Sequence, residues 1–253
     1  MRICFIGNSH LGPLAVSSQD IKAVHDADKR KFYISRTYGT QRLKVVGLNK
    51  VSILDMVKID ADSATKSTIF TEDYDQFVIV GFGFSLISIV ESWREYQPDD
   101  LPAYLGGQLM TKEVAKSYNN YCLAKSQASR LLAELRAVTD KPITLVPAPL
   151  PAKWAAEESG ERLETFHLFR GAEPARYVHD VFMKQQDRFR AEGIRIVSQP
   201  LETIDELIWT KSTLCLGQPG IDDPRGFFEK RDFYHMNKKF GNLMLQEVLD
   251  ALY

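Results

Sequence analysis

One segment limits the possible folds of this chain more than any other. DQFVIVGF, at Asp75–Phe82, is apolar on both faces of the strand that it predicts. A strand of this kind has to be covered from two sides, which is typical of the middle of a parallel sheet between two layers of helices. RICFIG, at Arg2–Gly7, predicts a second buried strand, and its glycine passes directly into a helix. The two segments together indicate an α/β protein.

Strands and helices alternate along much of the chain. Further strands are predicted over Lys31–Arg36, 142–152 and Gly193–Ser198, and helices over Pro13–Asp26, within 111–140, over Tyr177–Ala191 and over Met236–Leu252. Parallel strands need such helices for their right-handed return connections. We therefore expect one domain over residues 1–253, a three-layer α/β/α sandwich with a flavodoxin-like parallel sheet. A lid or insert is expected around residues 93–125 and 150–175, where aromatic residues suit either a sugar-binding surface or ordinary packing.

Charge and cysteine content exclude several classes of function. The 253 residues carry 32 Lys and Arg against 33 Asp and Glu, so there is no overall basic field for nucleic acid or an anionic membrane. No apolar run is long enough to cross a bilayer, and the N-terminus reads as a strand rather than a signal peptide. Cys4, Cys122 and Cys215 lack metal-ligand spacing and are expected to be small buried residues in a cytoplasmic protein. The sequence thus predicts no metal and no cofactor, and it leaves the oligomeric state open.

A serine follows the first predicted strand. Because parallel strands end at one edge of a sheet, Ser9, Gly39, Gly81 and Gly83 are expected to face a common crevice. A serine hydroxyl is a useful nucleophile only beside an imidazole that is oriented by a carboxylate. Asp232 and His235 stand three residues apart, just before the last predicted helix. The alternatives are that Ser9 only caps a helix and that His235 binds Asp232 for structure alone.

The segments GNSH and DFYHMNKKFG resemble the first and last motifs of the SGNH hydrolases, also called GDSL esterases and lipases, and in particular their carbohydrate-linked members. The resemblance implies Ser9 as nucleophile, His235 as general base and then acid, and Asp232 as its orienting partner. It also implies an oxyanion hole formed by the backbone N–H groups of Ser9 and Gly39, with Gly47 as an alternative to Gly39. The implied reaction removes a small acyl group, such as O-acetyl, from a carbohydrate through a covalent acyl-enzyme.

Two positions depart from the family pattern. Asn8 stands where the family has aspartate, and GFGFS lacks the asparagine that donates to the oxyanion. We expect the N–H of Gly83, or else Asn8 or His10, to replace that donor. Asn8 and His10 are candidates for substrate binding, with His10 expected as a wall of the crevice rather than as a base. Asn237 is expected either to bond the backbone of the last turn or to contact substrate. Three alternatives stay open: a carbohydrate O-acyltransferase using the same site, a non-catalytic SGNH-like module that binds a glycan or a protein, and a phosphate-binding turn at residues 7–12. Pro13, in place of the lysine of a P-loop, disfavours the last.

Overall fold

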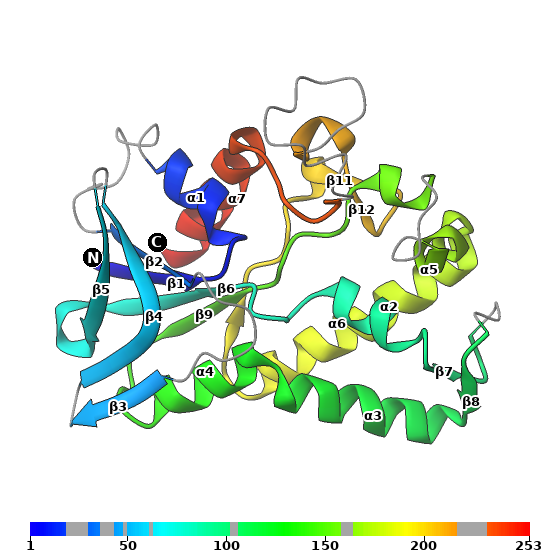
Figure 1. Ribbon diagram of the computed structural model, residues 1–253, viewed down its shortest axis with the longest axis horizontal. Coiled ribbons are helices and arrows are strands. Elements are labelled where there is room, and N and C mark those ends of the chain that lie inside the picture. Colours follow the sequence, from blue (N-terminus) through cyan, green and yellow to red (C-terminus); the bar gives the residue numbers. More distant parts are fainter. Residues whose placement is uncertain are drawn as a thin grey trace.

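The computed structural model describes residues 1–18, 30–35, 43–47, 50–60, 63–101, 106–157, 164–216 and 232–253. Within these ranges an eight-stranded sheet forms the centre of the molecule (Figure 1). Its parallel part consists of β10 (Arg195–Ile196), β9 (Ile143–Val146), β6 (Gln76–Val80), β1 (Ile3–Gly7) and β2 (Arg30–Ser35), in that spatial order. Numbered along the chain, the five strands have the order 2-1-3-4-5, which is flavodoxin-like. The predicted fold class is therefore confirmed.

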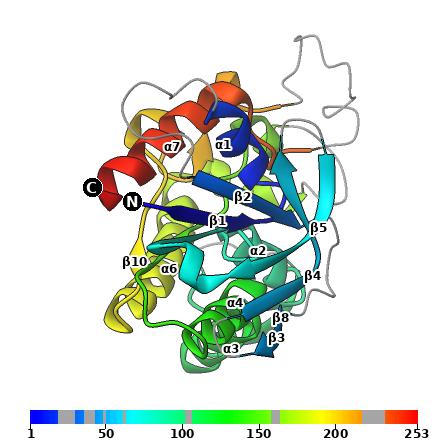
Figure 2. The same cartoon turned by 90° about the vertical axis from the view of Figure 1, so that its left-hand side faces the viewer.

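Helices cover both faces of this sheet. α1 (Leu11–Ser17) and α7 (Lys238–Leu252) lie side by side on one face, above the sheet in Figure 1. α4 (Gln127–Arg136) and α6 (Ala172–Ala191) lie on the other face, as Figure 2 also shows. α2 (Leu86–Ser92), α3 (Lys112–Lys125) and the short α5 (Glu164–His167) lie toward the right-hand side of Figure 1, beyond the sheet. The arrangement is the three-layer sandwich that the alternating pattern predicts.

The core explains why β1 and β6 occupy the centre. Every residue of both strands is buried. Phe5 of β1 stacks on Phe32 of β2 with their ring centroids 4.7 Å apart. α7 turns Phe240, Met244, Leu245, Val248 and Leu249 inward, a helical spacing that places one apolar face against α1 and the sheet.

An antiparallel extension of the sheet had no counterpart in the sequence-based prediction. β4 (Lys50–Asp60) pairs antiparallel with β2, β3 (Leu43–Gly47) and β5 (Ser63–Phe70). Two small sheets complete the description: parallel β7 (Tyr96–Pro98) and β8 (Gln108–Met110), and antiparallel β11 (Ile204–Asp205) and β12 (Trp209–Thr210). Segment 43–70 is rich in Val, Ile and Thr, which fits strands.

Several predicted boundaries were wrong. The single helix expected within 111–140 is divided at Ser126, whose Oγ accepts a hydrogen bond from the N–H of Ser129 at 3.1 Å and so begins a new helix. The strand expected over 142–152 ends at Val146, because prolines at 147, 149 and 151 lack the N–H that a sheet ladder needs. Only Arg195–Ile196 pair within the strand predicted over 193–198. α1 ends at Ser17, and residues 19–29 lie outside the described part of the chain.

Two of the four aromatic residues considered for a lid, Trp93, Tyr96, Tyr104 and Trp154, are core residues. Trp93 and Trp154 are 1% and 3% exposed, and Trp154 packs edge-on against Phe233. Tyr96 is 40% exposed and lies beside Tyr118. Tyr104 falls outside the described residues. Packing therefore accounts for the two tryptophans.

Two further observations bear on the composition argument. Cys4 and Cys215 are buried free thiols, as expected, whereas Cys122 is partly exposed. Among the described residues no helix has the length and apolar character needed to span a membrane.

Candidate active site

A tight turn joins β1 to α1 and carries Ser9. The N–H of Leu11 donates to the carbonyl oxygen of Asn8, and the N–H of Gly12 donates to that of Ser9, both at 3.0 Å. The Oδ1 of Asn8 accepts from the N–H of His10 at 3.2 Å. Asn8 therefore holds the turn through its backbone and its side chain, a role that does not require the charge of the aspartate usual in the family.

The turn after β6 packs directly against the turn that carries Ser9. Gly81 has φ +78°, and a Cβ at this position would lie 2.6 Å from Asn8 Oδ1 and 3.1 Å from His10 Cδ2. Glycine is thus needed at residue 81 both for its left-handed backbone and for the close approach of the two turns. Phe82 and Gly83 follow with φ +56° and +76°.

Two backbone N–H groups at these turns are available to a ligand. No described residue accepts a hydrogen bond from the N–H of Ser9 or from that of Gly83. A Cβ built on Gly83 would meet no atom within 4 Å, so the residue borders open space. These are two of the donors proposed for the oxyanion. Gly39 lies outside the described residues, and its alternative, Gly47, ends β3, which pairs with β4 rather than with β1.

Asp232 and His235 form a hydrogen-bonded pair. The Nδ1 of His235 lies 2.6 Å from Asp232 Oδ2, while Oδ1 accepts from the N–H groups of His235 at 3.2 Å and Tyr234 at 3.4 Å. Because an ionised carboxylate only accepts, Nδ1 carries the proton and Nε2 is left as the basic nitrogen when the imidazole is neutral. This is the tautomer that a general base needs.

Main-chain contacts hold this loop against the core. Phe233 is fully buried, and its carbonyl oxygen accepts from the N–H of Ala152 at 2.7 Å. The carbonyl oxygen of His235 accepts from the N–H of Leu216 at 2.9 Å. These bonds hold the backbone of the loop in place, and the Asp232 carboxylate orients the imidazole of His235.

Asn237 binds backbone, one of the two roles that the sequence allows. Its Oδ1 accepts from the N–H of Phe240 at 3.1 Å and so caps α7, and its Nδ2 donates to the carbonyl oxygen of Thr213 at 2.9 Å. Gly241, in the same motif, lies against α1, because a Cβ there would be 2.3 Å from the carbonyl oxygen of Pro13. The end of the DFYHMNKKFG motif therefore docks α7 on α1.

The two motifs from opposite ends of the chain meet through a pair of histidines. The ring centroids of His10 and His235 are 5.5 Å apart. Ser9, next to His10, has a buried Oγ with no hydrogen-bond partner among the described residues, so a bond from Ser9 to His235 is not formed. Such an orphan hydroxyl costs stability, about 1–3 kcal/mol.

His10 is a neutral imidazole. Burial and, to a lesser degree, the neighbouring His235 lower the pKa of His10 from 6.5 to about 3, while Asp232 opposes the shift. The side chain is 8% exposed, and its Nδ1 has no partner among the described residues. His10, expected from the sequence as a wall of the crevice, lines the pocket described next.

A pocket of about 310 Å³ adjoins the two turns. Its lining combines residues of both turns, of α2, of the segment after β9 and of the Asp232–His235 loop: Asn8, His10, Gly83, Ser85, Ile87, Ser88, Glu91, Ala148 and Tyr234. The α2 residues were not identified from the sequence. Their signal was the i, i+3, i+6 spacing of Ser85, Ser88 and Glu91 after the glycine turn, which predicts one polar helix face.

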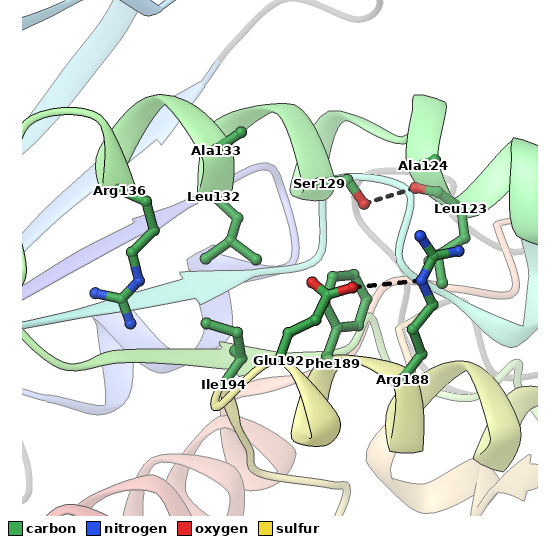
Figure 3. A pocket seen from close by; sticks show the side chains of 10 residues that line it. All are labelled: Leu123, Ala124, Ser129, Leu132, Ala133, Arg136, Arg188, Phe189, Glu192 and Ile194. Carbon is green, nitrogen blue, oxygen red and sulfur yellow. Dashed lines mark hydrogen bonds and ion pairs between the residues drawn. The ribbon is translucent and has the colours of Figure 1, made fainter.

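Another cavity, of about 370 Å³, contains none of the predicted site residues. It lies between α4 and the end of α6, where Figure 3 shows the Arg188–Glu192 ion pair beside Leu132 and Ile194. Among the described residues there is no group of three or more His, Cys, Asp or Glu side chains that could hold a metal ion.

Comparisons with known proteins give a distant structural likeness. No protein-family model matches the chain, and no curated protein matches its sequence. Among solved structures, one described as "Crystal structure of an acetyl xylan esterase AlAXEase" is similar over 100% of both chains, with a TM-score of 0.42 and 13% sequence identity. At this degree of likeness, the fold assignment rests on the observed strand order, and the site rests on its own geometry.

Proposed function

We propose that this protein is a serine esterase of the SGNH type that removes a small acyl group, O-acetyl above all, from a carbohydrate. The observation that carries the proposal is the Asp232–His235 pair, 2.6 Å apart, close to the turn in which the Oγ of Ser9 is buried without a partner. Native proteins rarely leave a buried hydroxyl unbonded. The unbonded hydroxyl of Ser9 is explained if it serves as the nucleophile that attacks the substrate.

The proposed reaction has two halves. The Oγ of Ser9 bonds to the acyl carbon while the Nε2 of His235 takes its proton, and Asp232 stabilises the resulting imidazolium. The N–H groups of Ser9 and Gly83 bind the oxyanion. His235 then gives the proton to the departing sugar oxygen, and the ester C–O bond breaks. Water repeats the sequence on the acyl-enzyme and releases the acid.

The proposal requires the Oγ of Ser9, which has no hydrogen-bond partner among the described residues, to turn toward His235 by a rotamer change about its Cα–Cβ bond. Catalytic hydrogen bonds are often long or poorly aligned without substrate, and they tighten in the complex. A mechanism of this kind does not require a hydrogen bond between Ser9 and His235 before substrate binds.

The test is labelling with a fluorophosphonate, which reacts with activated serines, read by intact mass together with p-nitrophenyl acetate turnover. Wild-type protein should gain one label at Ser9 and turn over the ester, and Ser9→Ala should do neither. Ser92→Ala is the matched control, because Ser92 ends α2 and its Oγ donates to the carbonyl oxygen of Ile89. A folded wild-type protein that takes no label, or a label retained in Ser9→Ala, would contradict the proposal.

One observation favours a second candidate, a non-catalytic module that binds a glycan. The GFGFS turn has no asparagine side chain for the oxyanion, and losing one such donor costs about 2.7–4 kcal/mol of transition-state stabilisation. This candidate predicts no labelling of the folded protein but measurable binding of an acetylated sugar by calorimetry. Labelling and calorimetry on one preparation of the protein therefore distinguish the two functions.

A further inference from the structure

A further cavity lies between α3 and α6, and its described lining shares no residue with the candidate active site. Its volume is about 560 Å³, within the range of roughly 300–1,000 Å³ that is usual for sites of small organic ligands. Residues of the two helices form most of the lining, together with Asp100, which follows β7. The cavity is therefore large enough for a ligand of its own.

Two amide side chains without hydrogen bonds line this cavity. Asn119 stands in the middle of the buried stripe Ala115, Asn119 and Leu123 of α3, and Gln185 belongs to the buried face of α6. The two residues are only 9% and 8% exposed, yet neither amide is bonded to any residue that the structure describes. Neither amide has an atom among the fully enclosed polar atoms without a partner, so both amides can be reached from the cavity that they line.

The neighbouring Gln186 shows how a buried glutamine in α6 is otherwise accommodated. Its Oε1 accepts from the hydroxyl of Ser198 at 2.9 Å and from the guanidinium of Arg190 at 3.2 Å. Leaving a largely buried amide without such bonds costs stability, and a ligand that supplies them recovers the cost. Because each amide both donates and accepts, a ligand with an amide group of its own suits Asn119 and Gln185.

Lysines give the cavity a positive rim. Lys116 and Lys184 are exposed lining residues, and neither forms an ion pair within the described part of the chain. Lys112 instead lies 3.4 Å from Asp100. Asp180 is the other carboxylate, so three lysines and two aspartates leave the described lining with one net positive charge. This balance favours a ligand with a single negative charge.

We propose that this cavity binds a small organic monoanion that combines a carboxylate, an amide and a short apolar group, as an N-acylated amino acid does. The amide of the ligand pairs with Asn119 and Gln185, and its carboxylate binds at Lys116 and Lys184. The apolar group packs beside Val181, which also lines the cavity. The site is separate from the proposed esterase site, and the proposal does not depend on that function.

The first test compares two probes that differ in charge, N-acetyl-L-leucine and its neutral amide, titrated into the protein and followed by NMR. Wild-type protein should bind the acid about tenfold more tightly than the amide, and Lys116→Gln combined with Lys184→Gln should reduce this preference to within about threefold. Lys239→Gln is the matched control, because α7 covers the opposite face of the sheet (Figure 2). No saturable binding of the acid, or an equal preference in wild type and the double variant, would overturn the proposal.

The second test removes the amides and keeps the shape of the side chains. Asn119→Leu combined with Gln185→Met should weaken binding of both probes about fivefold or more, while the melting temperature stays the same or rises, because no unbonded amide is left. Unchanged affinity would refute the role of the amides, and a lower melting temperature would show that they are bonded within the protein. Ser9→Ala should bind the acid as wild type does. Loss of binding in Ser9→Ala would instead place the probe in the candidate active site and overturn the assignment.

Discussion

Replacing His10 by phenylalanine should change the pH dependence of stability. In the folded protein burial lowers the pKa of His10 from 6.5 to about 3. Above pH 6.5 the imidazole is neutral in both the folded and the unfolded chain, and it contributes no pH dependence. Between pH 6.5 and about 3, His10 is protonated in the unfolded chain but stays neutral in the folded protein. The free energy of unfolding therefore falls as the pH falls.

The size of the effect follows from the two pKa values. At pH 5 the unfolded imidazole is almost fully protonated and the folded one is not, which lowers the free energy of unfolding by about 2 kcal/mol relative to pH 8. His10→Phe removes this loss and keeps an aromatic ring in the same place. His235, Asp232, Tyr234 and Glu91, the ionisable groups around His10, are present in both proteins.

Urea unfolding at pH 8, 7, 6 and 5, followed by tryptophan fluorescence, measures the difference. The free energy of unfolding of His10→Phe minus that of wild type should increase steadily as the pH falls. This difference should be about 2 kcal/mol larger at pH 5 than at pH 8. If the difference in unfolding free energy between wild type and His10→Phe is the same at every pH in this range, the claim that His10 is buried in its neutral form is refuted.

Three further changes test other contacts. Asp232→Asn should lower kcat by up to about 10⁴-fold with little loss of melting temperature, because the imidazole loses its orienting carboxylate. A variant that loses its fold along with its activity would instead indicate that Asp232 and His235 pair for structure alone. Ser9→Ala should raise the free energy of urea unfolding by about 1 kcal/mol, because it removes a buried hydroxyl without a partner; a destabilised variant would show that the hydroxyl is bonded. Gly241→Ala should destabilise the protein by about 1–3 kcal/mol, because the new Cβ would lie 2.3 Å from the carbonyl oxygen of Pro13; unchanged urea midpoints would mean that α1 and α7 can separate without cost.

The parallel part of the fold could be predicted because its signals are local. Residues 3–7 and 76–80 are apolar on both faces, and that pattern alone requires two covering layers. The division of the predicted long helix at Ser126 could have been inferred from serines at 126 and 129, since a capping serine is a local signal. The antiparallel pairing of β4 with β2 depends on contacts between segments that strand propensity does not specify.

The sequence indicated the two turns of the candidate site but not the contribution of α2 to its lining. The short spacing within GNSH and DFYH fixes which residues lie at each turn, and the Asp232–His235 bond follows from that spacing. The contribution of α2 depends on how the Gly81–Gly83 turn directs the helix, with three successive positive φ values including that of Phe82. A left-handed phenylalanine is uncommon and is not anticipated by sequence rules, so Glu91 could not be placed in the lining of the same pocket as His10 in advance.

The docking of α7 on α1 determines when the site comes into existence. The Oγ of Ser17 lies 3.0 Å from the carbonyl oxygen of Lys238, a contact that spans 221 residues of chain. At a synthesis rate of about 5–20 residues per second, the segment with Ser9 precedes the segment with His235 by roughly ten to forty seconds. Closing so long a loop also costs about 5 kcal/mol of chain entropy, which only the finished core offsets. Under the proposed mechanism a partly made or partly unfolded chain therefore holds a serine without a base, and ester turnover reports the fraction of molecules whose two ends have met.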